Sequence, residues 1–181
     1  MIRTLAKNTI LAALLPLFFL VALTACIDDR DDDADSTAKV KVGDRIPAFI
    51  VTTTDGIDIA SASLSGHAYI LNFFDTGCPD CQRVLPELQR IYDAYLAGVM
   101  VLNVPRSQTK DEIQAYWDKA GLTMPFYIPH DYNLYYQFAT RGIPRTYVVD
   151  AQGRVFAAFC DSPTADFATL DSLLKKANKQ Q

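Results

Sequence analysis

The sequence FFDTGCPDCQRVLPEL, residues 73–88, contains two cysteines that are separated by two residues. The pair lies between two different structural patterns. The stretch overlaps the apolar run AYILNFF (68–74), which is typical of a buried central strand. It leads into residues 79–97, whose apolar side chains recur at helical spacing. We therefore expect Cys78 and Cys81 at the start of a helix that follows a strand. A cysteine pair in this position can exchange electrons, hold a metal or staple a turn.

The surroundings of the pair favour redox chemistry. Unpaired N–H groups and the helix dipole stabilise a thiolate at Cys78, while Cys81 lies one turn further in and is shielded. Cys78 is therefore the expected attacking sulfur, and Cys81 would resolve the mixed disulfide. A zinc site, which needs four ligands, and a structural disulfide, which would constrain the chain little across so short a loop, are weaker alternatives. His67 and His130 show no ligand-like spacing, so no metal and no cofactor is predicted.

The composition of the 181-residue chain is that of one ordinary globular domain plus a processed segment. Hydrophobic residues make up 50% and charged residues 21%, which supplies enough apolar material for a full core. The formal net charge of −4 argues against nucleic-acid binding. Four cysteines are too few for a disulfide-stabilised scaffold of this length.

Residues 1–25 have the features of a secretory signal peptide. Their apolar run, TILAALLPLFFLVAL (9–23), has 15 residues, whereas a membrane-spanning helix needs about 20. The run leads into LTAC (23–26), which resembles the lipobox of bacterial lipoproteins. That resemblance implies that Cys26 becomes the lipidated N-terminus of a mature protein outside the cytoplasm, where disulfides persist. The alternative is a plain signal peptide with an incidental cysteine.

Residues 26–38 are predicted to tether this anchor to the folded domain. The stretch IDDRDDDADSTA (27–38) holds six aspartates and no apolar pattern, so like charges repel and no face can be buried. It also resembles the acidic signals that send some lipoproteins to the cell surface, although a solvated spacer is the simpler interpretation. The rest of the chain, 39–181, carries 14 basic and 15 acidic residues and is predicted to form the domain.

Within the domain, strand and helix patterns alternate, which indicates an α/β fold with a mixed sheet between helices. IPAFIVTTTDGIDIAS (46–61) predicts a hairpin that turns at its Asp-Gly pair. Thr109 and Glu112 form a capping box for a helix that ends at Gly121. The other predicted elements are strands at 98–105, 145–150 and 154–159, a short helix at 132–140 and a last helix at 162–176 that begins with Ser162-Pro163.

Four stretches together resemble thioredoxin-fold proteins of the redoxin class, and within them the TlpA/ResA-like thiol–disulfide oxidoreductases. The resemblance covers residues 42–177 and implies a thioredoxin fold: a central mixed β-sheet flanked by helices, with an added N-terminal β-hairpin. The four stretches are VGDRIPAFIVTTTDG (42–56), ILNFFDTGCPDCQRVLP (70–86), GLTMPFYIPHDYNLYYQFATRGIPRTYVVD (121–150) and DAQGR (150–154).

The same resemblance implies a substrate groove beside the cysteines. Pro144 would be the cis-proline that faces the pair, leaving the neighbouring backbone free to bind an extended substrate segment. Ile143 and Arg145 flank it and would border the groove, together with Pro79 and Asp80 between the two cysteines. A solvated charge at the end of a strand is an equally good interpretation of Arg145.

The sequence departs from the family pattern where protons are handled. Val84 stands where the family usually has a glutamate, and Asn72 stands where thioredoxin has a buried aspartate. Gly77 replaces the tryptophan that often precedes the first cysteine. Asp75, Asp80 or water therefore remain as proton acceptors, and each aspartate can also be a simple exposed charge at the start of the helix.

These observations predict an extracytoplasmic, membrane-anchored thiol–disulfide oxidoreductase that reduces protein disulfides through a CPDC dithiol. Its expected partners are disulfide-containing client proteins, a membrane thiol-transfer protein as electron donor, and the membrane through the lipid anchor. The expected location is the cell envelope, facing the periplasm or the cell surface. The acidic Asp80 and Asp75 disfavour a thiolate at the pair, which predicts a reducing rather than an oxidising couple.

Two other functions remain open. A peroxiredoxin-like thiol peroxidase would resemble P-x-x-x-T-x-x-C, but Leu71 and Asp75 stand at the proline and threonine positions. A non-catalytic metal-binding lipoprotein on the same fold is the second alternative, although copper chaperones of this type favour a C-x-x-x-C spacing. Cys160, at the end of a predicted strand, is interpreted as a small buried hydrophobic residue or as a third redox thiol.

Overall fold

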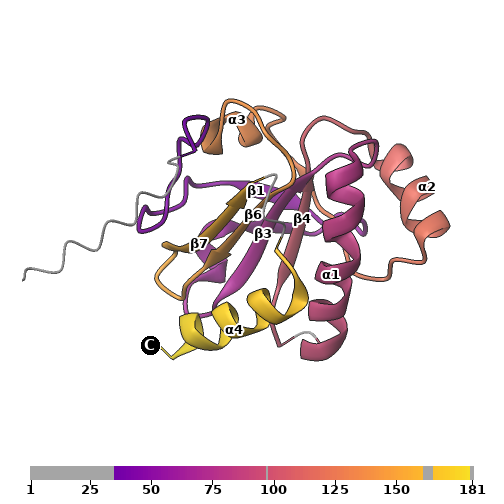
Figure 1. Ribbon diagram of the computed structural model, residues 1–181. Helices are drawn as coiled ribbons and strands as arrows, with labels where there is room; N and C mark the ends of the chain where they lie inside the picture. The colour runs from indigo at the N-terminus through magenta and orange to yellow at the C-terminus, as the bar shows by residue number, and fades with distance from the viewer. Residues whose placement is uncertain (1–34, 97, 161–164, 180–181) are drawn as a thin grey trace, which may run out of the picture. The chain divides into compact units, whose positions relative to one another are not determined.

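The computed structural model describes residues 35–96, 98–160 and 165–179 (Figure 1). The chain divides into two compact units after Ala34, and the described residues all belong to the second unit, Asp35–Gln181.

The predicted signal peptide (1–25), the lipidated Cys26 and most of the tether (26–38) lie outside the described residues. They therefore stay predictions. Among the residues that are described, no helix is both long enough and apolar enough to cross a membrane.

The helices and strands of the described residues follow the predicted order, with a few additions. In chain order they are β1 (Ile50–Thr52), β2 (Asp58–Ala60), the 3₁₀ helix η1 (Ser61–Leu64), β3 (Tyr69–Phe74), α1 (Pro79–Tyr95), β4 (Val101–Pro105), α2 (Lys110–Ala120), β5 (Ile128–Pro129), α3 (Leu134–Phe138), β6 (Arg145–Val149), β7 (Val155–Cys160) and α4 (Phe167–Asn178).

The main sheet has the strand order β4-β3-β6-β7. β3 and β4 run parallel, whereas β6 pairs antiparallel with both β3 and β7. This mixed sheet confirms the predicted fold class. The parallel pair requires a crossover connection, and α1 supplies it, so α1 begins directly beyond the end of the central strand (Figure 1).

A smaller sheet contains the predicted hairpin. β1 and β2 pair antiparallel around a turn in which Gly56 has a φ of 86°, as the Asp-Gly signal predicts. β5 extends this sheet on the other side of β1. We did not predict β5, because two residues are too few to produce an alternating pattern and only pairing with β1 defines the strand.

The core lies on both faces of the main sheet, because the side chains of β3 alternate between them. Ile70 and Phe74 pack in one cluster with α1, α2 and α4, while Leu71 and Phe73 pack in another with α3 and the hairpin. α1 and α4 lie against one another on their face (Figure 1). Burial on both sides explains why β3 is apolar at every position except Asn72 instead of alternating.

Two helices test the capping predictions. Thr109 and Glu112 form the predicted capping box at the start of α2, and Gly121 ends that helix with a φ of 67°. The predicted start of the last helix is wrong: α4 begins after Asp166, whose carboxylate accepts a hydrogen bond from the N–H of Thr169 at 2.8 Å. An aspartate at this position satisfies one of the unpaired donors of the first turn.

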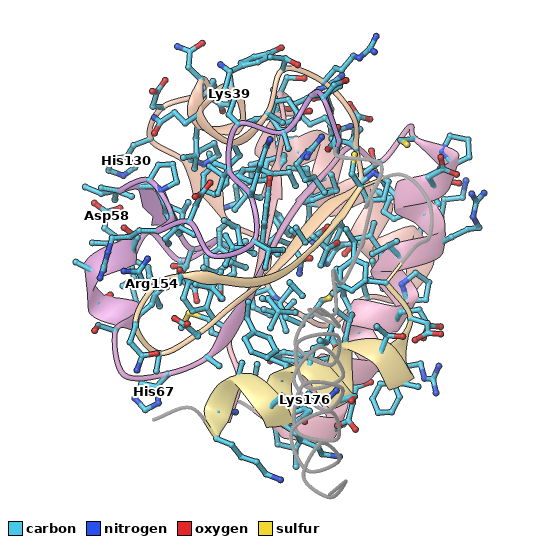
Figure 2. The ribbon with its side chains drawn as sticks, turned by 60° about the vertical axis from the view of Figure 1, so that its left-hand side comes forward. Lys39, Asp58, His67, His130, Arg154 and Lys176 are labelled. Atoms are coloured by element: carbon cyan, nitrogen blue, oxygen red, sulfur yellow. The ribbon has the colours of Figure 1, made fainter. Side chains whose placement is uncertain are left out.

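The end of the predicted tether is also different from the expectation, since residues 35–38 are held against the domain. Ala38 forms a β-bridge with Ala139, and the N–H of Lys39 donates to the carbonyl of Phe138 at 2.8 Å. The ammonium group of Lys39, labelled in Figure 2, donates to the carbonyl of Tyr136 at 2.7 Å. The folded unit therefore includes the last residues of the acidic run.

Candidate active site

Cys78 lies at the junction that the sequence predicts, between β3 and α1. It is the N-cap of α1 with extended backbone angles, φ −86° and ψ 121°, and Pro79 follows at the first helical position. Proline suits that position because its missing N–H would have no partner in the first turn of a helix. Cys78 is half-buried, Pro79 is exposed, and Cys81 is fully buried one turn further along.

Two glutamines hold the loop that leads to Cys78. The side chain of Gln108 accepts from the N–H of Thr76 and donates to its hydroxyl, both at 2.7 Å. Gln82 donates to the carbonyl of Thr76 at 2.8 Å. These side chains add to the loop's own turn, in which the N–H of Cys78 donates to the carbonyl of Asp75 at 3.1 Å. Sequence reasoning missed both glutamines, since no local pattern links Gln108 to a residue 32 positions away.

The loop before β6 faces the first cysteine. The Ile143–Pro144 peptide bond is cis, which confirms that prediction. The thiol of Cys78 donates to the carbonyl oxygen of Ile143, with 3.6 Å between sulfur and oxygen. Ile143 is half-buried and Pro144 is buried. The fold thus brings the predicted groove residues Ile143 and Pro144 to the cysteine pair.

The two thiols lie in different environments. Burial is the largest cause that raises the pKa of Cys81 far above its usual value. A backbone hydrogen bond from Asp75 lowers this pKa, whereas the hydrogen bond to Cys78 and the charges of Cys78 and Asp75 raise it. Cys81 is therefore held as a neutral thiol until its environment changes. Cys78 is the more accessible of the two sulfurs, which agrees with the predicted order of attack.

The two candidate proton acceptors have different partners. The carboxylate of Asp80 forms an ion pair with Arg83 on the exposed side of α1. Asp75 accepts a hydrogen bond from the N–H of Gly77 at 2.8 Å, and its charge contributes to the raised pKa of Cys81. Of these two aspartates, the structure thus links Asp75 to the buried thiol.

This geometry can be compared with known proteins. The family model described as AhpC/TSA matches residues 42–158, which includes both cysteines and the cis-proline. The chain belongs to the AhpC/TSA family. This confirms the family predicted from the four sequence stretches.

Relatives of this AhpC/TSA protein have a consistent description. A protein of Halalkalibacterium halodurans named thiol-disulfide oxidoreductase ResA is 27% identical over 116 residues, which cover 64% of this chain and 66% of that protein. A protein of the same name from Bacillus thuringiensis is 25% identical over 139 residues, covering 76% and 79% of the two chains. The chain thus spans 66% and 79% of the length of these two relatives.

A solved structure agrees with them. The crystal structure of a thiol:disulfide interchange protein of the thioredoxin family, from Chlorobium tepidum, superimposes with a TM-score of 0.64 and 27% identity. The superposition covers 75% of this chain and 97% of that one. The thioredoxin fold and the enzyme class predicted from the sequence, thiol–disulfide oxidoreductase, are both confirmed by these likenesses.

Asn72 has a structural role in this AhpC/TSA chain. It is fully buried in β3, where its side chain accepts from the hydroxyl of Thr146 at 3.0 Å and donates to the side chain of Asn103 at 3.3 Å. These bonds link the neighbouring strands β6 and β4 to the central strand. A side chain with both polar atoms engaged in this way has its hydrogen-bonding capacity largely used.

Tyr116 of α2 is a partly buried residue, packed against the apolar cluster that contains Cys81, to which sequence reasoning gave no role. Burial is the main cause that raises the pKa of its hydroxyl, and the charge of Cys81 raises it further. Tyr116 therefore lies within electrostatic reach of the cysteine pair. In the sequence it looks like one of several aromatic residues on an amphipathic helix, with no signal that distinguishes it.

Both interpretations of Arg145 were wrong. Its side chain is only 2% exposed, so it neither borders the groove nor projects into solvent. Its guanidinium is paired with the carboxylate of Asp35 at 2.6 Å. A buried charge is retained only where it has such a partner. The fold therefore uses Arg145 to hold the residues that precede the predicted domain boundary.

Three further residues that the sequence analysis considered are Cys160, His67 and His130. Among the residues that the structure describes, no three histidine, cysteine, aspartate or glutamate side chains are grouped to hold a metal ion. His130 contacts Asp58 at 2.9 Å on the hairpin side, far from His67 (Figure 2). Cys160 ends β7, half-buried, directly opposite Arg145 in the sheet register.

Proposed function

We propose that the protein reduces disulfides of client proteins at the cell envelope, with Cys78 and Cys81 as the reacting dithiol. One observation carries the proposal. The half-buried sulfur of Cys78 lies 3.6 Å from the carbonyl oxygen of Ile143, with the buried Cys81 behind it. A client segment that binds along the backbone at Ile143 would present its disulfide to Cys78 and not to Cys81.

The reaction follows from these positions. The thiolate of Cys78 attacks one sulfur of the client disulfide, forming a mixed disulfide and releasing the other client sulfur as a thiolate, which takes up a proton. The thiol of Cys81 then loses its proton and attacks the sulfur of Cys78, which releases the second client thiol. The client gains two electrons and two protons in total, and the protein is left with a Cys78–Cys81 disulfide.

Asp75 is the group proposed to receive the proton of Cys81. A buried thiol needs a nearby base in order to react, because its thiolate is strongly disfavoured. The electrostatic link between Asp75 and Cys81 supports this assignment. Asp80 is the less suitable base, since its carboxylate is already paired with Arg83.

The location and the electron supply belong to the same proposal. The LTAC sequence supports lipidation of Cys26 and attachment to the membrane, with the domain facing the periplasm or the cell surface. A membrane thiol-transfer protein would return two electrons to the Cys78–Cys81 disulfide. In the oxidising compartment outside the cytoplasm, a reducing dithiol needs such a donor.

Reduction of insulin by purified protein tests the function. Cys78→Ser is expected to abolish it, because the attacking sulfur is lost. Cys81→Ser is expected to accumulate a stable mixed disulfide between Cys78 and the client, detectable by non-reducing electrophoresis and mass spectrometry. Cys160→Ser serves as the control that keeps both sulfurs of the pair. Normal insulin reduction by the Cys78→Ser/Cys81→Ser variant would rule the proposal out.

The same variants separate the alternatives. A thiol peroxidase would consume hydrogen peroxide in a reaction that needs Cys78, at a rate above its reduction of insulin. A metal-binding lipoprotein would bind copper or zinc tightly in its reduced form and would leave insulin intact. The positions of Leu71 and Asp75, where a peroxidase pattern has proline and threonine, favour the oxidoreductase.

A further inference from the structure

The loop Arg141–Pro144, called the proline loop below, presents three consecutive carbonyl oxygens, and each has a partner. The first accepts a hydrogen bond from the guanidinium of Arg145 at 2.9 Å, and the hydroxyl oxygen of Thr37 lies 3.1 Å from it. The second accepts from the hydroxyl of Tyr135 at 2.8 Å, and the third accepts from the thiol of Cys78. The backbone opposite the reactive sulfur is therefore held at every residue up to the proline.

The first of these contacts belongs to a polar cluster of Asp35, Thr37 and Arg145, called the latch below. One nitrogen of the Arg145 guanidinium binds Asp35 at 2.6 Å, and another binds the hydroxyl of Thr37 at 2.7 Å. The same hydroxyl also bonds to the carboxylate of Asp35 at 2.5 Å. Each member of the latch contacts the other two.

Arg145 depends on this cluster for its burial. Its Nε atom is buried without a hydrogen-bond partner among the described residues, so the remaining donors must stabilise the charge. A buried cation that loses its anion is strongly destabilised. Asp35 supplies the anion for the buried Arg145, which follows Pro144 in the chain, and Thr37 and the carbonyl of Arg141 supply further acceptors.

The backbone around the latch points to the same arrangement. The carbonyl of Thr37 accepts from the N–H of Thr140 at 2.9 Å, one residue before the proline loop. Ala38 continues the contact as a β-bridge to Ala139. Residues 37 and 38 thus bond to residues 139 and 140, which come just before the proline loop. The latch, to which Thr37 belongs, also bonds to the loop itself through Arg145.

We propose that Asp35, Thr37 and Arg145 are positioning residues that hold the proline loop opposite Cys78, so that the end of the N-terminal segment sets the affinity for client proteins. The inference rests on the proposed function, because it concerns how that function's client is bound. An extended client would pair with the backbone of the proline loop, whereas a small disulfide needs only the sulfur of Cys78. Loosening the loop therefore weakens binding of a protein client and leaves the sulfur chemistry in place.

The test compares two substrates for each variant of the full chain: insulin, and oxidised glutathione as a small disulfide. Asp35→Asn removes the charge while keeping the shape of the side chain, and Thr37→Val removes only the hydroxyl. Asp44→Asn is the matched control, an exposed aspartate nine positions after Asp35 whose carboxylate accepts from the backbone N–H of Lys41. Dithiothreitol is the electron donor that returns the Cys78–Cys81 disulfide to the dithiol, and the measured quantities are KM and kcat with insulin and the rate constant with oxidised glutathione.

For Asp35→Asn and Thr37→Val we expect kcat/KM with insulin to fall about tenfold, mainly through KM, because small displacements of a substrate-positioning group have effects of this order or larger. The rate with glutathione should stay within about twofold of the unaltered protein, and Asp44→Asn should match it with both substrates. Arg145→Lys in the Asp35→Asn background should add little, since residues of one network are not additive.

Three results would overturn the inference. Equal losses with insulin and glutathione would mean that the latch only stabilises the fold, and unchanged kinetics with both would mean that it has no part in client binding. A loss with insulin that appears in kcat alone would place the effect on chemistry. If the Cys78→Ser variant still reduces insulin as the unaltered protein does, the proposed function itself fails. Thr37→Val, which keeps the ion pair, provides a folded variant if Asp35→Asn is unstable.

Discussion

At the scale of single residues, the two cysteines differ because one helical turn separates an N-cap from a core position. Cys78 keeps access to solvent at the end of α1, while Cys81 packs among the apolar residues that α1 buries, including Val84 and Leu85. Low exposure and a raised pKa make Cys81 a resolving thiol, unable to compete with Cys78 for a client disulfide. Sequence spacing alone therefore produces the division of roles, because position in the helix sets exposure.

Asp80 is expected to keep the couple reducing. A disulfide is a stronger oxidant when its dithiol form, with its thiolate, is stabilised, and a carboxylate next to the attacking sulfur acts against that. We predict a potential of about −270 mV, and a positive shift in Asp80→His. A shift of about 30 mV would correspond to about 1.4 kcal/mol. Equilibration with glutathione or dithiothreitol measures both values.

The control for this charge effect is Asp93→His, which makes the same substitution on α1. Asp93 lies 13 residues after Asp80 on the helix, hence about 20 Å from it. At this distance, salt largely screens the interaction of an exposed charge with the cysteine pair. The reduction potential of the Asp93→His variant should equal that of the unaltered protein. A potential of the unaltered protein near about −120 mV, or equal potentials for both histidine variants, would show that Asp80 does not set the direction of electron flow.

Asp35 makes the stability of the domain depend on pH in a defined range. Partial burial would raise its pKa, but hydrogen bonds from Thr37 and Arg145 lower it from 3.8 to about 2. A carboxyl with a lowered pKa stabilises the fold above its unfolded-state value, and this contribution is lost as the pH falls through the folded-state value. The contribution of Asp35 is therefore complete above pH 3.8 and is lost near pH 2.

Urea unfolding of the unaltered protein and of Asp35→Asn measures this contribution. The difference in unfolding free energy should be about 1–2 kcal/mol at pH 7, a value reduced because the side chain is 34% exposed and partly screened. The difference should shrink between pH 4 and pH 2. A difference that stays constant over this range would mean that the ionisation of Asp35 is not linked to folding.

At the scale of secondary-structure elements, α2 supports the active site through the residue that comes just before its N-cap. Gln108, which holds the loop before Cys78 at Thr76, immediately precedes the N-cap of this helix. Further along, Trp117 packs against Phe74 at the end of the central strand, with ring centroids 5.2 Å apart. A well-ordered start of α2 therefore helps to order the cysteine loop.

The capping box of α2 gives a prediction at this scale. Thr109→Ala removes the side chain that accepts from the N–H of Glu112, and we expect a loss of about 1 kcal/mol in unfolding free energy. Ser107→Ala, an exposed residue two positions earlier, should change it by less than about 0.5 kcal/mol. Chemical denaturation followed by circular dichroism measures both. Equal stabilities for the two variants would contradict a stabilising role of the cap.

At the scale of the whole molecule, the boundary of the folded unit matters for both anchoring and function. The acidic run was predicted to be a spacer up to residue 38, yet the folded unit begins at Asp35. Two members of the latch, Asp35 and Thr37, therefore directly follow the part of the acidic run that is still predicted to be a spacer. A deletion that ends at residue 34 shortens the spacer, whereas one that ends at residue 37 also removes Asp35 and Thr37 of the latch.

Membrane attachment and deletion variants test this boundary. The unaltered protein should fractionate with membranes, and Cys26→Ala should be released or remain unprocessed, because the lipid anchor is lost. Deletion of residues 27–34 should keep insulin reduction in vitro, whereas deletion of 27–37 should reduce it, since only the longer deletion removes Asp35 and Thr37. A processed, soluble unaltered protein would contradict the anchor, and equal activity of the two deletions would contradict the latch.

The sequence by itself determined the features that depend on neighbouring residues. The apolar run of β3, the N-cap position of Cys78, the capping box at Thr109 and the hairpin turn at Gly56 each follow from side chains within a few positions of one another. Hydrophobic periodicity and turn chemistry are local signals, so they can be interpreted without the fold. The cis-proline was predicted from family resemblance rather than from its neighbours.

Only the tertiary structure decided which polar side chains meet across the fold. Arg145 pairs with Asp35 over 110 positions, and Gln108 reaches Thr76 over 32. Burial of an apolar face repeats along an element and leaves a pattern, whereas a single polar pair leaves none. The charge of Arg145 favoured a solvent-exposed position, because an arginine is buried only when a partner elsewhere in the chain compensates its charge. That partner lies in a run of aspartates whose composition indicates a solvated tether, so packing alone could identify it.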